Sequence, residues 1–369
     1  MTTSTSPSNH YPFLDGVRGV AALAVVFFHA AVSDQLPAVD GGIGGFIWNT
    51  LFMRGFLGVA VFFVLSGFVI SHSLRRGVST AGDYGNFMFR RLVRLNPPYW
   101  AAIVVAIAFH ALAVVVNGED FTPGGEPLSA SRLIHHIFYT QELAGFLNIN
   151  DVFWTLALEL QFYLALGLIV WAMTHLSNLF GAETYEVAGW VLSAGALLAA
   201  FTDSDLERAT TLPPIFYSFA VGILINWYWR KELSLVCVGT FLTGVGVLSF
   251  FSEDVAFSRA VALSGLVLLV ALHTGSVQTW LSSRPFQFLG RVSYSLYLVH
   301  VPILGATLLI ATRVVGTGPA GYILGTIASV ITSLIGAVIF WQLVEKPCVA
   351  WLRGNRSKPT PTPKVANAA

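Results

Sequence analysis

The sequence predicts an all-α, polytopic integral membrane protein with about ten transmembrane helices and both termini in the cytoplasm. Hydrophobic residues make up 55% of the 369 residues and charged residues only 11%, whereas a soluble domain carries about 25% charge. Apolar runs of about 17 to 25 residues, the length of one bilayer crossing, recur along the chain. Lysine and arginine are unequally shared between alternate loops. The net charge of +1 gives no indication of a nucleic-acid partner.

Ten apolar segments define the predicted spans: 14–33, 55–73, 97–117, 152–174, 185–201, 211–229, 233–251, 256–273, 292–312 and 320–343. The first lacks a basic leader and a convincing cleavage site, so we expect an uncleaved helix. Segment 132–147 is too short and polar to cross the bilayer, and we expect it at the interface. Residues 1–349 then form a single membrane domain, and residues 350–369 a disordered cytoplasmic tail.

The basic residues predict the orientation of the chain. Of the 20 lysines and arginines, 14 lie on the side of the two termini and five on the opposite side, with Arg18 inside the first span. Basic loops remain in the cytoplasm during insertion. We therefore expect a multi-pass protein of the cell (plasma or inner) membrane whose surroundings are the lipid bilayer.

Arg18 and His29 interrupt the first apolar segment. His29 is eleven positions after Arg18, which is about three helical turns, so the two residues share one face about 16 Å apart. Ionisable residues inside a membrane indicate function by default, and a neutral imidazole can take a proton from a hydroxyl. The alternatives are a packing hydrogen bond for His29 and an arginine that reaches the membrane surface for Arg18.

Glu159 is predicted at a depth similar to that of His29. Counting residues from the span ends places His29 about 22 Å from the cytoplasmic mouth and Glu159 about 10 Å below the outer surface of a core about 30 Å thick. A carboxylate at that depth needs a partner, and a carboxylate can orient an imidazole. The sequence therefore predicts His29 and Glu159 as a catalytic pair.

Two further stretches contain candidate donor-binding residues. Arg91 and Arg94 occur in FMFRRLVRLNPPYW, at the predicted cytoplasmic mouth just before Pro97. They share a helix face, and arginine forks match phosphate oxygens. Anionic lipid headgroups are the alternative ligands. Tyr294 and His300, from LGRVSYSLYLVH, can line a polar slot, although aromatic packing alone also explains that pattern.

Six motifs together resemble the acyltransferase 3 family of membrane O-acyltransferases. They are LDGVRGVAALAVVFFH, GVAVFFVLSGFVIS, FRRLVRLNPPYW, WTLALELQFYL, GRVSYSLYLVH and VEKP. The resemblance implies transfer of an acyl group, usually acetyl, from cytoplasmic acyl-coenzyme A to a hydroxyl of a surface polysaccharide, a glycolipid or a glycosylated metabolite. It also implies that Arg18 and His29 are the essential pair of the family and that Arg91 and Arg94 are its RxxR pair.

This hypothesis assigns His29 as general base, assisted by Glu159, with an acyl-histidine intermediate as the competing chemistry. The residues expected to bind acyl-coenzyme A are Arg18, Arg91, Arg94, Tyr294 and His300. Neither cysteine has a metal-type spacing with a histidine, so we expect no metal. The alternative function is a transporter or flippase of a polar lipid-linked substrate, because histidine and glutamate inside a membrane also occur in proton relays.

Overall fold

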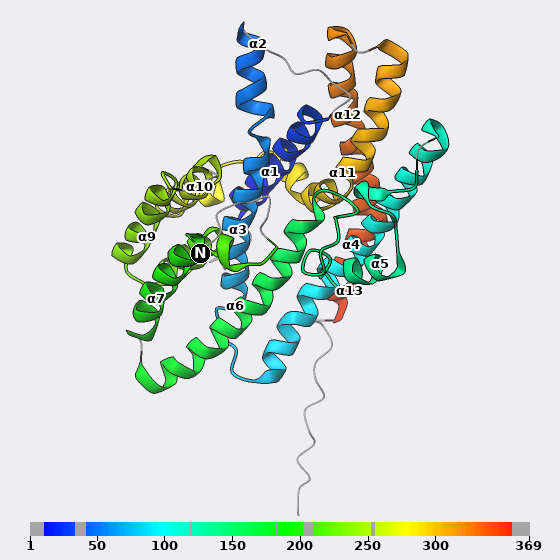
Figure 1. Cartoon of the computed structure of the whole chain (residues 1–369). Helices are drawn as coiled ribbons and strands as arrows, with labels where there is room; N and C mark the ends of the chain where they lie inside the picture. The colour runs from blue at the N-terminus through cyan, green and yellow to red at the C-terminus, as the bar shows by residue number, and fades with distance from the viewer. Residues whose placement is uncertain are drawn as a thin grey trace, which may run out of the picture.

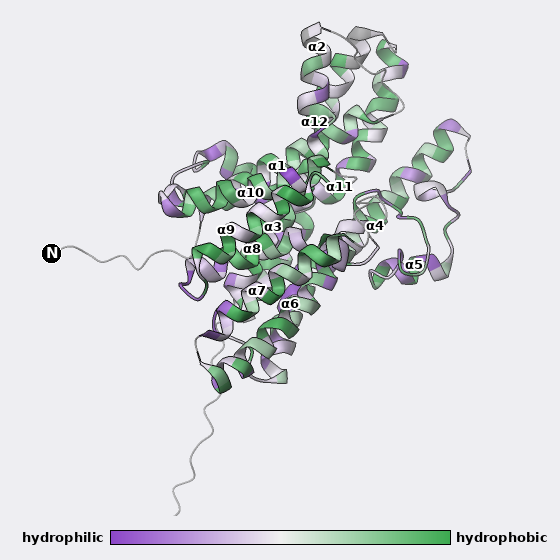
Figure 2. Cartoon of the chain, turned by 60° about the vertical axis from the view of Figure 1, so that its left-hand side comes forward, coloured by the Kyte–Doolittle hydropathy of each residue, from purple (hydrophilic) through white to green (hydrophobic). Residues whose placement is uncertain are grey.

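The computed structural model describes residues 11–33, 42–118, 120–181, 183–201, 210–251, 255–316 and 318–355. Within these ranges the chain is helical and contains no β-strand. Figure 1 shows α1, α3 and α11 near the centre of the bundle, with α7, α9 and α10 on one side and α4 and α5 on the other. Apolar residues cover most of the helices, and polar residues gather near helix ends and loops (Figure 2).

A helix lies at each of the ten predicted spans. These helices are α1 (Pro12–Ala31), α3 (Gly58–Ser73), α4 (Ala81–Asn117), α6 (Phe153–Phe180), α7 (Glu183–Ala200), α8 (Phe216–Trp229), α9 (Leu235–Leu248), α10 (Val255–His273), α11 (Arg284–Val315) and α12 (Pro319–Phe340). Shorter helices are α2 (Gly42–Ile47), α5 (Ala130–Ile137) and α13 (Lys346–Asn355). The helix α13 includes the start of the segment expected to be a tail, and residues 356–369 lie outside the described residues.

Seven stretches of the described chain are long and apolar enough to cross a membrane: Pro12–Ala31, Trp48–Ser73, Ala81–Asn117, Phe153–Phe180, Val255–His273, Arg284–Val315 and Ile323–Leu352. Helices α8 and α9 have 14 residues each, or about 21 Å, which is less than a core of about 30 Å. The all-α, multi-span class is confirmed. The count of ten and the cytoplasmic termini stay predictions.

Helix α4 differs from its predicted boundaries. It begins at Ala81, where the Thr80 hydroxyl accepts from the Asp83 N–H at 3.1 Å and the Asp83 carboxylate accepts from the Thr80 N–H at 2.9 Å. This capping box starts the helix, which then continues through Pro97 and Pro98. The predicted span 97–117 is the C-terminal part of this longer helix, because a bundle tolerates prolines inside a helix. The arginines before Pro97 lie within α4, and their place at the cytoplasmic mouth of the span stays a prediction.

Helices α1 and α11 run parallel and in register. A Cβ atom on Gly19 would lie 2.6 Å from the backbone nitrogen of Gly290, so the two backbones touch at this level. Ten residues further along both helices, the rings of His29 and His300 meet at 3.2 Å, and the same offset of 271 residues relates both pairs. This contact aligns one face of α1 with one face of α11 over most of the length of α1.

A second close contact joins α3 to α8. A Cβ atom on Gly222 would lie 2.0 Å from the carbonyl oxygen of Val64, and a Cβ atom on Gly67 would lie 2.0 Å from that of Phe219. Neither position has room for a side chain, because the backbones of the two helices are in contact there. Without a hydrophobic driving force between helices in lipid, such close packing is a main source of association.

The loop between α4 and α6 folds around Arg132. This side chain is fully buried, donates to the backbone carbonyls of Glu126, Pro123 at 2.8 Å and Leu147 at 2.9 Å, and forms an ion pair with the Glu126 carboxylate at 3.4 Å. His136 lies beside it in α5, which is only eight residues long. Its Nδ1 donates to the Arg132 carbonyl at 2.9 Å, and its Nε2 accepts from the Ile149 N–H at 3.0 Å.

We expect Gly222→Ala to destabilise the protein by about 1 to 3 kcal/mol, because the new methyl group overlaps a backbone carbonyl. The measurement is the thermal unfolding midpoint in detergent. Gly239→Ala in α9 is the matched control, because a Cβ atom there meets nothing within 4 Å. An equal midpoint for the two variants would show that α3 and α8 are not in backbone contact.

Acidification should destabilise the loop through His136. Burial lowers the pKa of His136 from its ordinary value of 6.5 to about 4. Below pH of about 6.5 the unfolded chain takes up a proton that the folded chain does not, so the free energy of unfolding falls as the pH falls toward 4. Between pH 7.5 and 5, the unfolding midpoint of the wild type should fall by about a few degrees more than that of His136→Gln. Parallel curves for the two proteins would contradict this.

Candidate functional site

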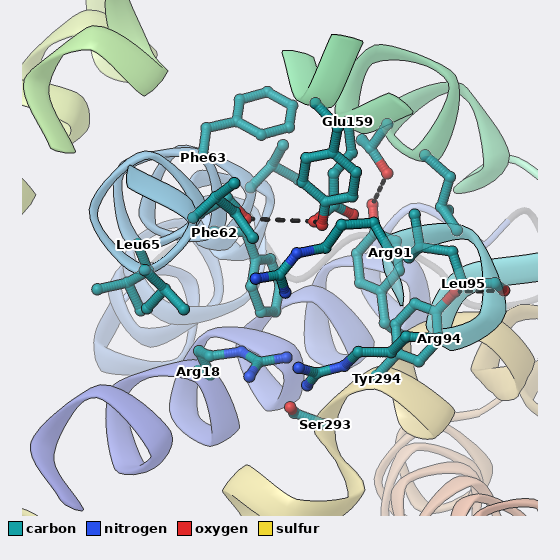
Figure 3. A pocket seen from close by; sticks show the side chains of 18 residues that line it. Arg18, Phe62, Phe63, Leu65, Arg91, Arg94, Leu95, Glu159, Ser293 and Tyr294 are labelled. Carbon is teal, nitrogen blue, oxygen red and sulfur yellow. Dashed lines mark hydrogen bonds between the residues drawn. The ribbon is translucent and has the colours of Figure 1, made fainter. Parts of the chain in front are cut away.

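A cavity with about 930 Å³ of empty space, part of it open to solvent, lies where α1, α3, α4, α6 and α11 meet (Figure 3). Four charged side chains reach it: Arg18 from α1, Arg91 and Arg94 from α4, and Glu159 from α6. The apolar wall contributed by α3 consists of Val59, Phe62, Phe63, Leu65, Val69 and Ile70. The described cavity thus joins residues that are far apart in the sequence.

The three arginines of the cavity direct their charges into one space. In Figure 3 the guanidinium groups of Arg18 and Arg94 point toward each other, and that of Arg91 points into the same space. Arg91 also lies 5.7 Å from the centre of the Phe87 ring. Among the described residues, none of the three forms a hydrogen bond or an ion pair. The three positive charges repel each other in the apolar bundle. An anion with several oxygens would offset this repulsion and would accept hydrogen bonds from the guanidinium N–H groups.

Glu159 and Glu345 partly balance this positive charge. Glu159 accepts hydrogen bonds from the Tyr163 hydroxyl and from the Ser66 hydroxyl at 3.3 Å. Glu345, which ends a π-helical turn (Trp341–Glu345), is buried and accepts from the Ser295 hydroxyl at 2.6 Å. Both carboxylates lie within electrostatic range of Arg18. The cavity is therefore a cationic site with one carboxylate, Glu159, at its wall and a second, Glu345, behind it.

His29 lies beside His300, and the two rings have centres 4.9 Å apart. Neither histidine lines the cavity; Phe62 and Tyr297, which do, have ring centres 5.5 Å apart. The ring of Tyr297 lies 6.1 Å from that of His300. One aromatic layer thus separates the arginine cavity from the histidine pair.

The structure therefore separates two residues that the sequence predicts as a pair. Within the described residues, His29 is hydrogen-bonded to Val25 and His300, whereas Glu159 is hydrogen-bonded to Ser66 and Tyr163. Helix α6 has 28 residues, or about 42 Å, which exceeds a bilayer core of about 30 Å. The similar depth of His29 and Glu159 in a membrane stays a prediction, but their hydrogen-bond partners are different.

The residues expected to bind a donor divide into two groups. Arg18, Arg91, Arg94 and Tyr294 line the cavity, and the Tyr294 hydroxyl donates to the Leu95 carbonyl at 3.1 Å. His300 lies outside the cavity, against His29. The residues that sequence reasoning missed are Ser66, Thr155 and Glu345. Thr155 bonds the Tyr297 hydroxyl at 2.8 Å, and Glu345 lies two residues beyond the end of the last predicted span, where an ionisable residue could have been noticed.

No group of three histidine, cysteine, aspartate or glutamate side chains that could hold a metal ion occurs in the part of the chain that the structure describes. The side chains that the described site does present are guanidinium, imidazole, carboxylate and hydroxyl groups. This combination can bind an anion at the arginines and move a proton at the histidines.

Inorganic pyrophosphate should raise the thermal unfolding midpoint of the wild type, because it carries several oxygens for the arginines of the cavity. We expect the shift to be largely lost in Arg91→Gln and Arg94→Gln. Arg90→Gln, at the exposed neighbouring position, is the control and should retain it. A shift that persists in the first two variants, or that is lost equally in all three, would contradict an anion site in the cavity.

Comparison with known proteins adds a family and several relatives. The family model described as an acyltransferase domain matches residues 11–342. The chain is 27% identical to Nodulation protein 10 of Rhizobium leguminosarum bv. viciae, over 93% of this chain and 94% of that protein. It is 24% identical to a Bacillus subtilis (strain 168) protein named "Putative peptidoglycan O-acetyltransferase YrhL", over 94% of this chain and 56% of that protein.

It is also 23% identical to the O-acetyltransferase OatA of Staphylococcus aureus, over 80% of this chain and 51% of that protein. The chain thus spans about half the length of the two relatives named as O-acetyltransferases. No solved structure matches it.

Proposed function

The chain belongs to this acyltransferase family, and we propose that it transfers an acetyl group from cytoplasmic acetyl-coenzyme A to a hydroxyl of a carbohydrate-type acceptor. The observation that carries the proposal is a cluster of three arginines without anionic contacts among the described residues, facing a cavity. The cluster is linked along α1 to a histidine pair in which His300 is fully buried and His29 is half-buried. The names of two relatives support acetyl as the group. One of them, that of the Bacillus subtilis protein, contains peptidoglycan and supports a glycan as the acceptor class.

The donor is a polyanionic nucleotide with a long, thin arm that ends in a thioester. Arg18, Arg91 and Arg94 bind its phosphates with charge-assisted hydrogen bonds. Glu159 and Glu345 hold the guanidinium charges in balance when no anion is bound, so we assign Glu159 to the cationic cavity rather than to His29. The arm then extends about 16 Å along α1, the distance from Arg18 to His29, past Phe62 and Tyr297.

His29 acts as general base on the acceptor. Its imidazole removes the proton of the acceptor hydroxyl as the oxygen attacks the thioester carbonyl. A carbon–oxygen bond forms and the carbon–sulfur bond breaks. The proton passes from His29 to the sulfur, and coenzyme A leaves as a thiol. The acceptor arrives from the outer side of the membrane, so neither substrate crosses it.

His29→Ala should lower transfer by about 10²- to 10⁴-fold, because the general base is lost. Purified protein in nanodiscs is supplied with acetyl-coenzyme A labelled in the acetyl group and with N-acetylglucosamine oligosaccharides. Labelled oligosaccharide and released coenzyme A are measured. His175→Ala, at an exposed position of α6, is the matched control and should leave both rates unchanged.

Acetyl-coenzyme A should still raise the unfolding midpoint of the His29→Ala protein, because the arginines remain. Wild-type rates in this variant would overturn the role of His29. Movement of a labelled glycolipid across a vesicle membrane, without release of coenzyme A by the wild type, would favour a transporter and overturn the proposed reaction.

A further inference from the structure

The ring nitrogens of His300 have distinct partners. His300 is fully buried, and its Nδ1 lies 3.0 Å from the carbonyl oxygen of Leu296 and 2.9 Å from that of Tyr297. A carbonyl oxygen can only accept a hydrogen bond. The hydrogen of the neutral His300 ring is therefore on Nδ1, and its Nε2 presents a lone pair.

That lone pair faces His29. The Nε2 of His300 lies 3.2 Å from the Nδ1 of His29, and the same Nδ1 lies 2.9 Å from the carbonyl oxygen of Val25. Both neighbours accept hydrogen bonds, so the Nδ1 of His29 carries a hydrogen. In the opposite assignment, the hydrogen between the two rings would be on Nε2 of His300. The Nδ1 lone pair of His29 would then point at the Val25 carbonyl oxygen, and the fully buried His300 ring would carry hydrogens on both nitrogens and a positive charge. The free lone pair of His29 is consequently on Nε2.

We propose that His300 is a positioning residue that holds His29 in the Nδ1–H tautomer, so that Nε2 of His29 is the nitrogen that takes the proton of the acceptor hydroxyl. The proposal rests on the proposed function and replaces the expectation that His300 binds the donor. It also assigns a task to a buried polar side chain that is separated from the donor cavity by Tyr297.

The pair resembles the base and orienting group of a catalytic triad, with a neutral ring in place of the carboxylate. While the proton of the acceptor is on Nε2, the His29 ring is positively charged. Its Nδ1–H then donates to the neutral Nε2 of His300, which spreads the charge without becoming protonated. When the proton passes to the sulfur of coenzyme A, both rings return to their initial state.

Among the described side chains that face the pair, His300 is the one that accepts a hydrogen bond from His29. Phe28 lies beside His29, and Tyr297 lies beside His300. The carboxylate within electrostatic range of His29 is that of Asp151, an exposed residue just before α6. Within the described residues it forms no hydrogen bond or ion pair with His29. The acceptors in contact with Nδ1 of His29 are therefore the Val25 carbonyl oxygen at 2.9 Å and the His300 ring at 3.2 Å. The ring is the acceptor that a side chain supplies from another helix, and it shares the Nδ1–H with the carbonyl.

Three substitutions test the position of that acceptor. His300→Gln offers an amide oxygen near the place of Nε2, His300→Asn is too short to reach it, and His300→Leu offers none. We expect His300→Gln to retain kcat within about 10-fold of the wild type, and the other two to lose about 10²- to 10⁴-fold. The affinity for acetyl-coenzyme A should be unchanged in all three, as measured by its shift of the unfolding midpoint.

Two kinetic outcomes would overturn the proposal. Equal losses in His300→Gln and His300→Asn would show that an acceptor at that position does not matter. A loss of donor affinity that accounts for the loss of rate would return His300 to donor binding. If His29→Ala abolishes transfer while His300→Leu retains it, the proposed function stands and only this inference fails.

A measurement on the wild type avoids any question of folding in the variants. With ¹⁵N-labelled histidine in lipid bilayers, solid-state NMR distinguishes protonated from unprotonated ring nitrogens, and a His29→Gln sample identifies the His29 signals. We expect the Nδ1–H tautomer for His29 and for His300. A Nε2–H tautomer of His29 in the free enzyme would overturn the proposal.

Discussion

The contact between α1 and α11 determines the geometry of the whole site. Because Gly19 and Gly290 bring the two backbones together, parallel helices with a constant offset align their residues at every level. Arg18 then lies near Ser293 at the cavity, and His29 meets His300 about 16 Å further along. A larger side chain at either glycine would separate both ends at once. The polar residues of two distant parts of the sequence act together only because these two small residues permit the approach.

The cationic cavity illustrates how a membrane bundle tolerates buried charge. Three guanidinium groups repel each other in a medium where solvation is weak. Two carboxylates, fixed by hydroxyl groups of Ser66, Tyr163 and Ser295, lie close enough to offset part of that repulsion without closing on the arginines. The donors of the arginines thus remain directed into the cavity. In the proposed function, the phosphates of the donor complete the charge balance, so that donor binding and the stability of this region are coupled.

Much of the architecture could be predicted from the sequence. The thickness of the bilayer sets the length of an apolar segment that spans it, and the cost of burying arginine or histidine in a membrane indicates that such residues have a function. Helices lie at all ten predicted segments, and four of the five expected donor-binding residues share one cavity. Contact between Glu159 and His29 could not be predicted, because a residue count along two helices does not say which side chains face each other: Glu159 bonds Ser66 and Tyr163, whereas His29 bonds His300. Partner choice could not be predicted either: the pairing of His29 with His300 depends on the register of α1 against α11, and nothing in either motif alone encodes that register.

The aromatic layer formed by Phe62 and Tyr297 has a consequence for the membrane as an electrical insulator. A water-filled path from the arginines to the histidines and on to the opposite face would let protons flow down their gradient and would dissipate the energy stored there. Two rings packed edge to face at 5.5 Å block such a path, and the Tyr297 hydroxyl is held by Thr155. In the proposed reaction, the slender thioester arm that parts these rings fills the gap it makes, so the barrier to ions is kept throughout the cycle.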